Sequence, residues 1–182
     1  MEPPPHGGQQ THFTCAQDLV RRLLREMTRR EISESQLAEL MDPHPEHGTA
    51  NYKLPILLRA LGCDIHHGQA GTVNDLVSAA QFNFFVMVNH LVIDPHDGQI
   101  EGHFSQVECI DIRRGVVRMY DPLGGRVVNE TITSFESNWR GEGGEQSWML
   151  TVDIHRSHRL VLPRGIVDDS VPLEKCSSRI VA

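Results

Sequence analysis

The sequence predicts an α+β fold in which a helical N-terminal half packs on an antiparallel β-sheet from the C-terminal half. Up to about residue 80, apolar residues recur at intervals of three and four, which is the period of a helix. From Phe84 onward they form short continuous or alternating runs separated by turn sequences, which is the pattern of strands. Helices followed by strands are typical of the α+β class.

The helical half contains four predicted helical segments. The first has an apolar stripe from Leu19 to Met27, and Thr14 stands where an N-cap is expected. Ser33 and Gln36 have the spacing of a capping box before a second helix. The other segments are recognised by leucine spacing and by a preceding glycine. Three of the four have predicted bounds, namely residues 15–29, 51–61 and 72–80.

The sheet half is predicted from β-rich runs that alternate with turns. Residues 113–115 and 121–125 contain the glycines and prolines expected of turns between strands. A helical segment of one or two turns is expected at residues 133–139. The predicted strands cover residues 84–89, 103–112, 116–120, 126–128 and 147–154.

The chain is long enough for one domain, which we place at residues 9–158. Residues 1–8 are rich in proline and glycine and are expected to be a flexible N-terminal segment. Residues 159–182 lack a clear period and are expected to be a loosely held C-terminal tail. With 39% hydrophobic and 23% charged residues, the composition excludes a wholly disordered or membrane-embedded protein.

Charge and hydropathy narrow the classes of partner. The 17 basic residues are outnumbered by 24 acidic ones, so nucleic acid is not an expected partner. The longest apolar run, residues 84–88, is too short to span a bilayer. Residues 1–10 lack the basic and apolar regions of a signal peptide. We therefore expect a cytoplasmic protein without a membrane span; its oligomeric state has no signature in the sequence.

The four cysteines are widely and irregularly spaced, which favours neither a disulfide framework nor a zinc site. Most of the eleven histidines fall in predicted turns or tails, where they are solvated, so no metal and no cofactor are expected. Residues 94–98 are interpreted as a turn that forms a rim near the site described next. We interpret Cys63, Cys109 and Cys176 as non-catalytic, two in packed elements and one in the tail.

The first helix also carries basic residues on one face. We expect this face to be solvated and to form ion pairs with Glu26 and Glu31. The basic residues are Arg21, Arg22, Arg25, Arg29 and Arg30.

Cys15 is the strongest candidate for a nucleophile. It stands at the predicted N-terminus of the first helix, where free backbone N–H groups and the positive end of the helix dipole favour a thiolate. Gln9 and Gln10 lie six and five residues upstream, close enough for one side chain to donate to an oxyanion near the sulfur. The alternative is that Cys15 is an inert, buried residue at the start of a helix.

His103 and Asp121 are candidates for the groups that would activate this thiol. His103 opens one predicted strand and Asp121 closes the next, so the two side chains can meet in a hairpin. A cysteine paired with a histidine that a third group orients is the arrangement of an activated nucleophile. Taken singly, each has a structural alternative: a histidine at a strand edge, and a turn aspartate that accepts from its own backbone.

Together these residues resemble the papain-like bacteriocin-processing (double-glycine) cysteine peptidases. The resemblance rests on Gln9 with Cys15-Ala16, on Gly102-His103-Phe104-Ser105, and on the run from Tyr120 to Gly125. It covers about residues 9–152. The family usually has glycine after the cysteine, and this chain has Ala16.

The resemblance implies a papain-like fold and a role for each motif residue. Cys15 is the nucleophile, His103 transfers the proton, and Asp121 orients the imidazole. Gln9, which the resemblance favours over Gln10, forms the oxyanion hole with the backbone N–H of Cys15. Family members are usually fused to exporter domains, whereas this chain is expected to be a stand-alone member.

The implied activity is that of a cysteine hydrolase or an amide-forming acyltransferase. Its substrate is expected to be a peptide or a peptide-like amide or thioester, possibly carrier-bound, that reacts through an acyl-enzyme. The alternative is a non-catalytic papain-like module that binds a peptide or a carrier-protein partner.

Overall fold

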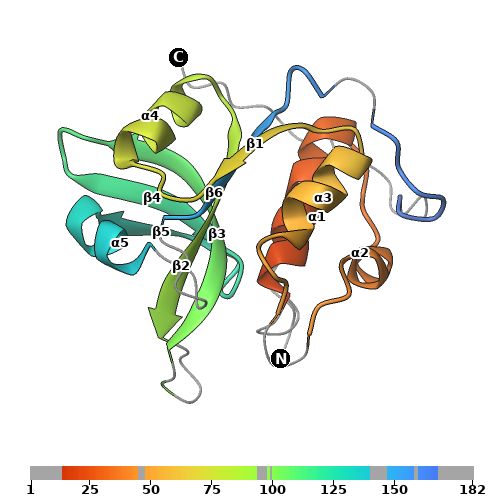
Figure 1. Cartoon of the computed structure of the whole chain (residues 1–182), viewed down its shortest axis with the longest axis horizontal. Coiled ribbons are helices and arrows are strands. Elements are labelled where there is room, and N and C mark those ends of the chain that lie inside the picture. The colour runs from red at the N-terminus through yellow and green to blue at the C-terminus, as the bar shows by residue number, and fades with distance from the viewer. Residues whose placement is uncertain are drawn as a thin grey trace.

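A computed structural model describes residues 14–44, 48–93, 98, 100–139, 147–157 and 160–167. Six strands form one antiparallel sheet in the order β1-β6-β2-β3-β4-β5. Three helices, α1 to α3, lie on one side of this sheet, while α4 and α5 lie on the other (Figure 1). The predicted α+β class, with a helical N-terminal part packed on an antiparallel sheet, is confirmed.

Every predicted helix and strand is present, with bounds that differ from the predicted ones by a few residues. The helices are α1 (Cys15–Thr28), α2 (Glu34–Met41), α3 (Lys53–Ala60), α4 (Val73–Gln81) and α5 (Ile132–Asn138). The strands are β1 (Asp64–Gly68), β2 (Phe85–Ile93), β3 (Ile100–Asp111), β4 (Val116–Asp121), β5 (Arg126–Thr131) and β6 (Met149–Asp153).

The edge strand β1 is the one described strand that the sequence did not predict. It is five residues long and pairs with β6, and Ile65 is its one buried side chain. His66 and His67 lie in this strand and are exposed. A short edge strand with a single buried residue lacks the alternation that marks longer strands.

Side-chain caps begin three of the helices. The Thr72 hydroxyl accepts a hydrogen bond from the backbone N–H of Asp75, and the Asp75 carboxylate accepts one from the backbone N–H of Thr72. The Ser33 hydroxyl accepts from the N–H of Gln36, and Thr131 caps α5 in the same way. Thr14 occupies the N-cap position of α1, as predicted, but its side chain makes no capping hydrogen bond. The backbone carbonyl of Thr14 accepts from the N–H of Asp18 at 3.1 Å, which closes the first turn of α1.

The sheet separates two apolar clusters, and β2 supplies residues to both. Phe85 and Met87 pack in the cluster under α1, α2 and α3, whereas Val86 and Val88 pack in the cluster under α4 and α5. Alternate residues of a strand point to opposite faces, so burial on both faces explains the continuous apolar run of this strand. Trp139 and Trp148 are both buried.

The central hairpins fix the register of the strands that carry the candidate site. In the β2–β3 pair, His90 lies opposite His103. Gly115, with a φ of 67°, closes the tight turn between β3 and β4. A β-bulge between Val107 and Cys109 shifts the register of this second hairpin, and such a bulge re-aims the side chains around it.

Part of the segment predicted to be a loose tail is packed. Val161 donates its N–H to the carbonyl of Leu61 at 2.8 Å, and Ser33 donates to the carbonyl of Ile166 at 2.7 Å. Ile166 is fully buried in the helical cluster, and Val167 forms a β-bridge with Ile32. Residues 160–167 therefore close over the helical half, while residues 168–182 lie outside the described residues.

Candidate active site

Cys15 is the first residue of α1, at the end of that helix that carries unpaired backbone N–H groups. Its side chain is 5% exposed. The thiol lies close enough to the imidazole of His103 to help raise the pKa of that ring. The structure thus brings together the helix that holds the cysteine and the strand that holds the histidine.

His103 lies on β3 and is 4% exposed. Its Nε2 is 2.8 Å from Oδ1 of Asp121, the last residue of β4. The same Asp121 oxygen accepts the backbone N–H of Leu123 at 2.9 Å, which holds the carboxylate within its own turn. Because Nε2 is engaged with Asp121, Nδ1 is the ring nitrogen that remains for the thiol.

These contacts favour a charged imidazole between two acceptors. Burial opposes the imidazolium, but the hydrogen bonds to Asp121 and Cys15 outweigh it and raise the pKa of His103 to about 10. Burial also acts to raise the pKa of Asp121, but the hydrogen bond and the positive charge of His103 hold the pKa of this carboxyl below its usual range. Asp121 is therefore ionised, and His103 is protonated, at neutral pH.

A second histidine, which the sequence analysis missed, lies beside His103. The rings of His90 and His103 meet edge to face, with their centroids 5.8 Å apart. His90 Nε2 is 2.9 Å from the Ser105 hydroxyl, and its ring packs against Phe135. Complete burial, together with the charge of His103, lowers the pKa of His90 to about 3. His90 is thus a neutral, hydrogen-bonded ring that packs against the charged imidazole of His103.

Two other predictions about the site fall partly or wholly outside the described residues. Gln9 and Gln10, the predicted oxyanion donors, are both outside. Of the turn at residues 94–98, interpreted as a rim of the site, only Gly98 is described.

The remaining cysteines differ from one another. Cys63 is buried, and this burial raises the pKa of its thiol to about 11, as expected of an inert core residue. Cys109 lies on β3 but is exposed, so its predicted packed position is wrong. The bulge beside it explains the difference, because strand alternation is broken there. Cys176 lies outside the described residues.

Within the described part of the chain, no three histidine, cysteine or acidic side chains converge as a metal site would require. The described helices also include none that is long and apolar enough to cross a membrane.

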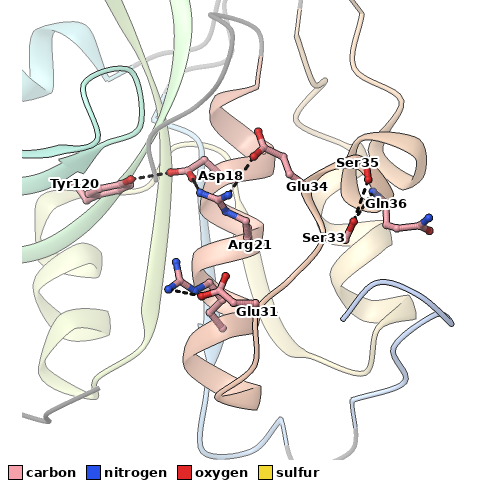
Figure 2. A network of polar contacts seen from close by, with 9 residues as sticks. Asp18, Arg21, Glu31, Ser33, Glu34, Ser35, Gln36 and Tyr120 are labelled. Carbon is pink, nitrogen blue, oxygen red and sulfur yellow. Dashed lines mark hydrogen bonds and ion pairs between the residues drawn. The ribbon is translucent and has the colours of Figure 1, made fainter. Parts of the chain in front are cut away.

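The basic face of α1 is less solvated than predicted. Arg25 pairs with Glu31 at 2.7 Å, as expected. Arg21, however, lies between Asp18 and Glu34, at 2.8 Å and 3.1 Å (Figure 2). Arg22 pairs with Glu108 of β3, and its guanidinium lies 4.0 Å from the ring centre of Tyr120. Two of these arginines therefore join α1 to its neighbours in the fold.

Comparison with known proteins identifies the fold. No family model matches the sequence, and no curated protein matches it. Among solved structures, the chain is similar to the peptidase domain of Streptococcus ComA, a bi-functional ABC transporter involved in a quorum-sensing pathway. The match has a TM-score of 0.57 at 17% identity and covers 81% of this chain and 94% of that domain. This structural match confirms the papain-like fold that the sequence resemblance implied.

Proposed function

We propose that this protein is a papain-like cysteine hydrolase or acyltransferase that acts on a peptide or peptide-like amide or thioester. The observation that carries the proposal is the position of His103, whose imidazole is bonded to Asp121 and contacts the Cys15 thiol. The peptidase-domain fold supports a peptide-like substrate.

In the first step, the Cys15 sulfur attacks the substrate carbonyl carbon and forms a tetrahedral oxyanion. His103, protonated by the thiol proton, gives that proton to the leaving amine of an amide, or to the leaving thiol of a thioester, as its bond to the carbonyl carbon breaks. The product is a thioester between Cys15 and the acyl group. Asp121 keeps the ring oriented and stabilises its positive charge throughout.

In the second step, water or an amine attacks the thioester carbonyl. The attacking group gives a proton to His103, and the thiolate of Cys15 leaves. Water completes a hydrolysis and an amine completes an acyl transfer. The nucleophile and the proton carrier are the same in both reactions, so the proposal covers both.

Gln9 remains the proposed side-chain donor to the oxyanion. Its replacement by Ala is expected to lower the rate by about 10²–10³-fold, which is the effect of losing one such donor. A comparable loss on replacing Gln10 instead would transfer this role to Gln10 and leave the rest of the mechanism unchanged.

Selective alkylation tests the proposal without a known substrate. The protein is treated with iodoacetamide over a range of pH, and labelling of each cysteine is followed by mass spectrometry. A cysteine that a neighbouring histidine activates reacts faster with iodoacetamide near neutral pH than an ordinary thiol does. The exposed Cys109 is the internal reference. Equal, slow labelling of Cys15 and Cys109 would contradict the proposal and favour a non-catalytic module that binds a peptide or a carrier protein.

A further inference from the structure

A buried hydrogen bond joins α1 to β4 next to the candidate site. The Tyr120 hydroxyl donates to Oδ2 of Asp18 at 2.8 Å (Figure 2). Asp18 is 4% exposed and Tyr120 is 5% exposed. The two residues are 102 positions apart in the chain, so this contact exists only when the helical part and the sheet are docked correctly.

Each partner in this bond is close in sequence to a residue of the candidate site. Asp18 lies three residues after Cys15 on α1, which is about one helical turn. Tyr120 immediately precedes Asp121 on β4. Adjacent residues of a strand point to opposite faces, so Tyr120 reaches α1 while Asp121 reaches His103. The Asp18–Tyr120 bond is therefore one helical turn from Cys15 and one strand position from Asp121. These are the two outer residues of the Cys15–His103–Asp121 arrangement.

Both partners are held by further contacts. The other Asp18 oxygen accepts from Arg21 at 2.8 Å, and Arg21 continues to Glu34 of α2. Arg22 covers the Tyr120 ring and bonds to Glu108 at the bulge of β3. Glu108 also accepts from Arg118 of β4. The outer ion pairs are partly exposed and are expected to contribute little on their own, whereas the Asp18–Tyr120 bond is buried.

We propose that Asp18 and Tyr120 are positioning residues that set the Cys15 thiol at the correct distance from His103 and Asp121. The inference rests on the proposed function. A buried donor or acceptor is costly to leave unpaired, so the pair favours a single docked position of α1 on β4. Without the pair, α1 keeps its apolar packing but loses the polar contact that fixes its position along the strand.

The test compares alkylation of Cys15 by iodoacetamide in four forms of the full-length protein. These are the wild type, Tyr120→Phe, Asp18→Ala and the double variant. Tyr120→Phe removes only the hydroxyl. We expect each single variant to slow Cys15 labelling below neutral pH by roughly 10-fold, since small displacements of a reacting group have effects of this size or larger. The pH profile of Cys15 should also move toward that of an ordinary thiol.

Two controls separate positioning from a general loss of stability. Labelling of Cys109, which is exposed on β3, should be unchanged in all forms. Val117→Ala removes part of a fully buried side chain of β4 in the opposite apolar cluster, and it should lower the melting temperature without changing Cys15 labelling. The double variant should be no slower than the slower single variant, because both substitutions remove the same bond.

The outcomes distinguish a failure of the proposed function from a failure of the positioning role of Asp18 and Tyr120. If Cys15 of the wild type is no more reactive than Cys109, the proposed function fails and this inference fails with it. If Cys15 of the wild type is reactive and Tyr120→Phe or Asp18→Ala leaves its rate and pH profile unchanged, the positioning role alone is overturned. Equal slowing by Val117→Ala would overturn it as well, because general destabilisation would then be sufficient.

Discussion

Cys15 lies in the helical half of the molecule, formed by α1 to α3, whereas His103 and Asp121 lie on neighbouring strands of the sheet half. The histidine and the aspartate are joined by a direct hydrogen bond within one hairpin. The cysteine reaches them only through the packing of α1 on β3 and β4. The position of Asp121 relative to His103 is thus set within one hairpin. The position of Cys15 relative to both depends on how the helical half docks on the sheet half.

This difference predicts that site substitutions in the two halves have different consequences. The thiol of Cys15 is small, so its removal takes little from the apolar cluster to which it belongs. The His103–Asp121 pair is a buried polar contact, and the loss of one partner leaves the other unsatisfied. The predictions below test this contrast.

The largest expected effect is that of Cys15→Ala. Activity should fall on the order of 10⁴-fold or more, because the acyl-enzyme can no longer form. Unfolding in denaturant should give a free energy close to that of the wild type. Turnover assays and chemical denaturation of the same preparation measure both quantities. Substantial turnover by this variant would place the chemistry elsewhere.

His103→Ala should reduce activity nearly as much, since it removes the proton carrier. In contrast to Cys15→Ala, it should also lower the free energy of unfolding, by about 1–3 kcal/mol, because the Asp121 carboxylate loses its partner. Parallel denaturation curves of the two variants make the comparison. Equal free energies of unfolding for Cys15→Ala and His103→Ala would contradict the expected difference between site substitutions in the helical half and in the sheet half.

Asp121→Asn should have a smaller effect on rate, at most about 10²-fold, since the amide oxygen can still orient the ring. It should also sharply lower the pKa of His103, because a neutral amide replaces the carboxylate in the hydrogen bond and in the ion pair. Titration of the His103 ring by NMR in both proteins measures this change. An unaltered titration would mean that Asp121 does not hold the charge on His103.

Stability should depend on pH in a way that reflects the two neighbouring histidines. The pKa of His103 is raised from 6.5 to about 10 in the folded protein, so its contribution is complete below pH 6.5 and is lost as the pH rises toward 10. The pKa of His90 is lowered to about 3, so its contribution is present above pH 6.5 and is lost as the pH falls toward 3. Melting temperatures should therefore be highest near pH 6.5.

The variant His103→Ala separates these contributions. It should flatten the decline in melting temperature between pH 6.5 and 8.5 and leave the acid decline in place. The range stops at pH 8.5 because Cys63, whose pKa is raised to about 11, adds its own loss of stability at higher pH. A decline of the same slope in wild type and variant would contradict the raised pKa of His103.

Much of the fold was predictable because the apolar period changes near Phe84. The helices of the first half and the hairpins of the second follow from spacing and turn residues alone. The edge strand β1 was not predictable, because a five-residue strand with Ile65 as its only buried residue has no period. Residues 160–167 are held by backbone hydrogen bonds to Leu61 and Ser33 and by the burial of Ile166, and neither gives a helix or strand period in the sequence.

The candidate site also contains contacts that the sequence predicts and contacts that only the structure shows. His103 and Asp121 were predicted to meet because a hairpin brings its strand ends together, and they lie 2.8 Å apart. His90 was missed because its importance comes from register with His103, which the sequence does not specify. Asp18 and Arg21 were missed for a related reason. Charged residues on a helix are usually solvated, and only the docked structure shows that they face Tyr120 and Glu34.

The smallest expected effects come from helix caps away from the site, one in each half. Thr72→Ala breaks a reciprocal capping box at α4 and should lower the free energy of unfolding by about 1 kcal/mol. Ser33→Ala removes a longer capping bond of 3.4 Å at α2, together with an exposed hydroxyl contact to Ser35 at 3.0 Å, and should cost about 0.5 kcal/mol, at the low end for such caps. Both losses are measured by denaturation. Neither variant should change the rate at which iodoacetamide labels Cys15, because neither cap contacts the Asp18–Tyr120 bond. If Ser33→Ala slowed this labelling while Thr72→Ala did not, the position of α1 would depend on α2 as well, through the Arg21–Glu34 ion pair that adjoins this cap.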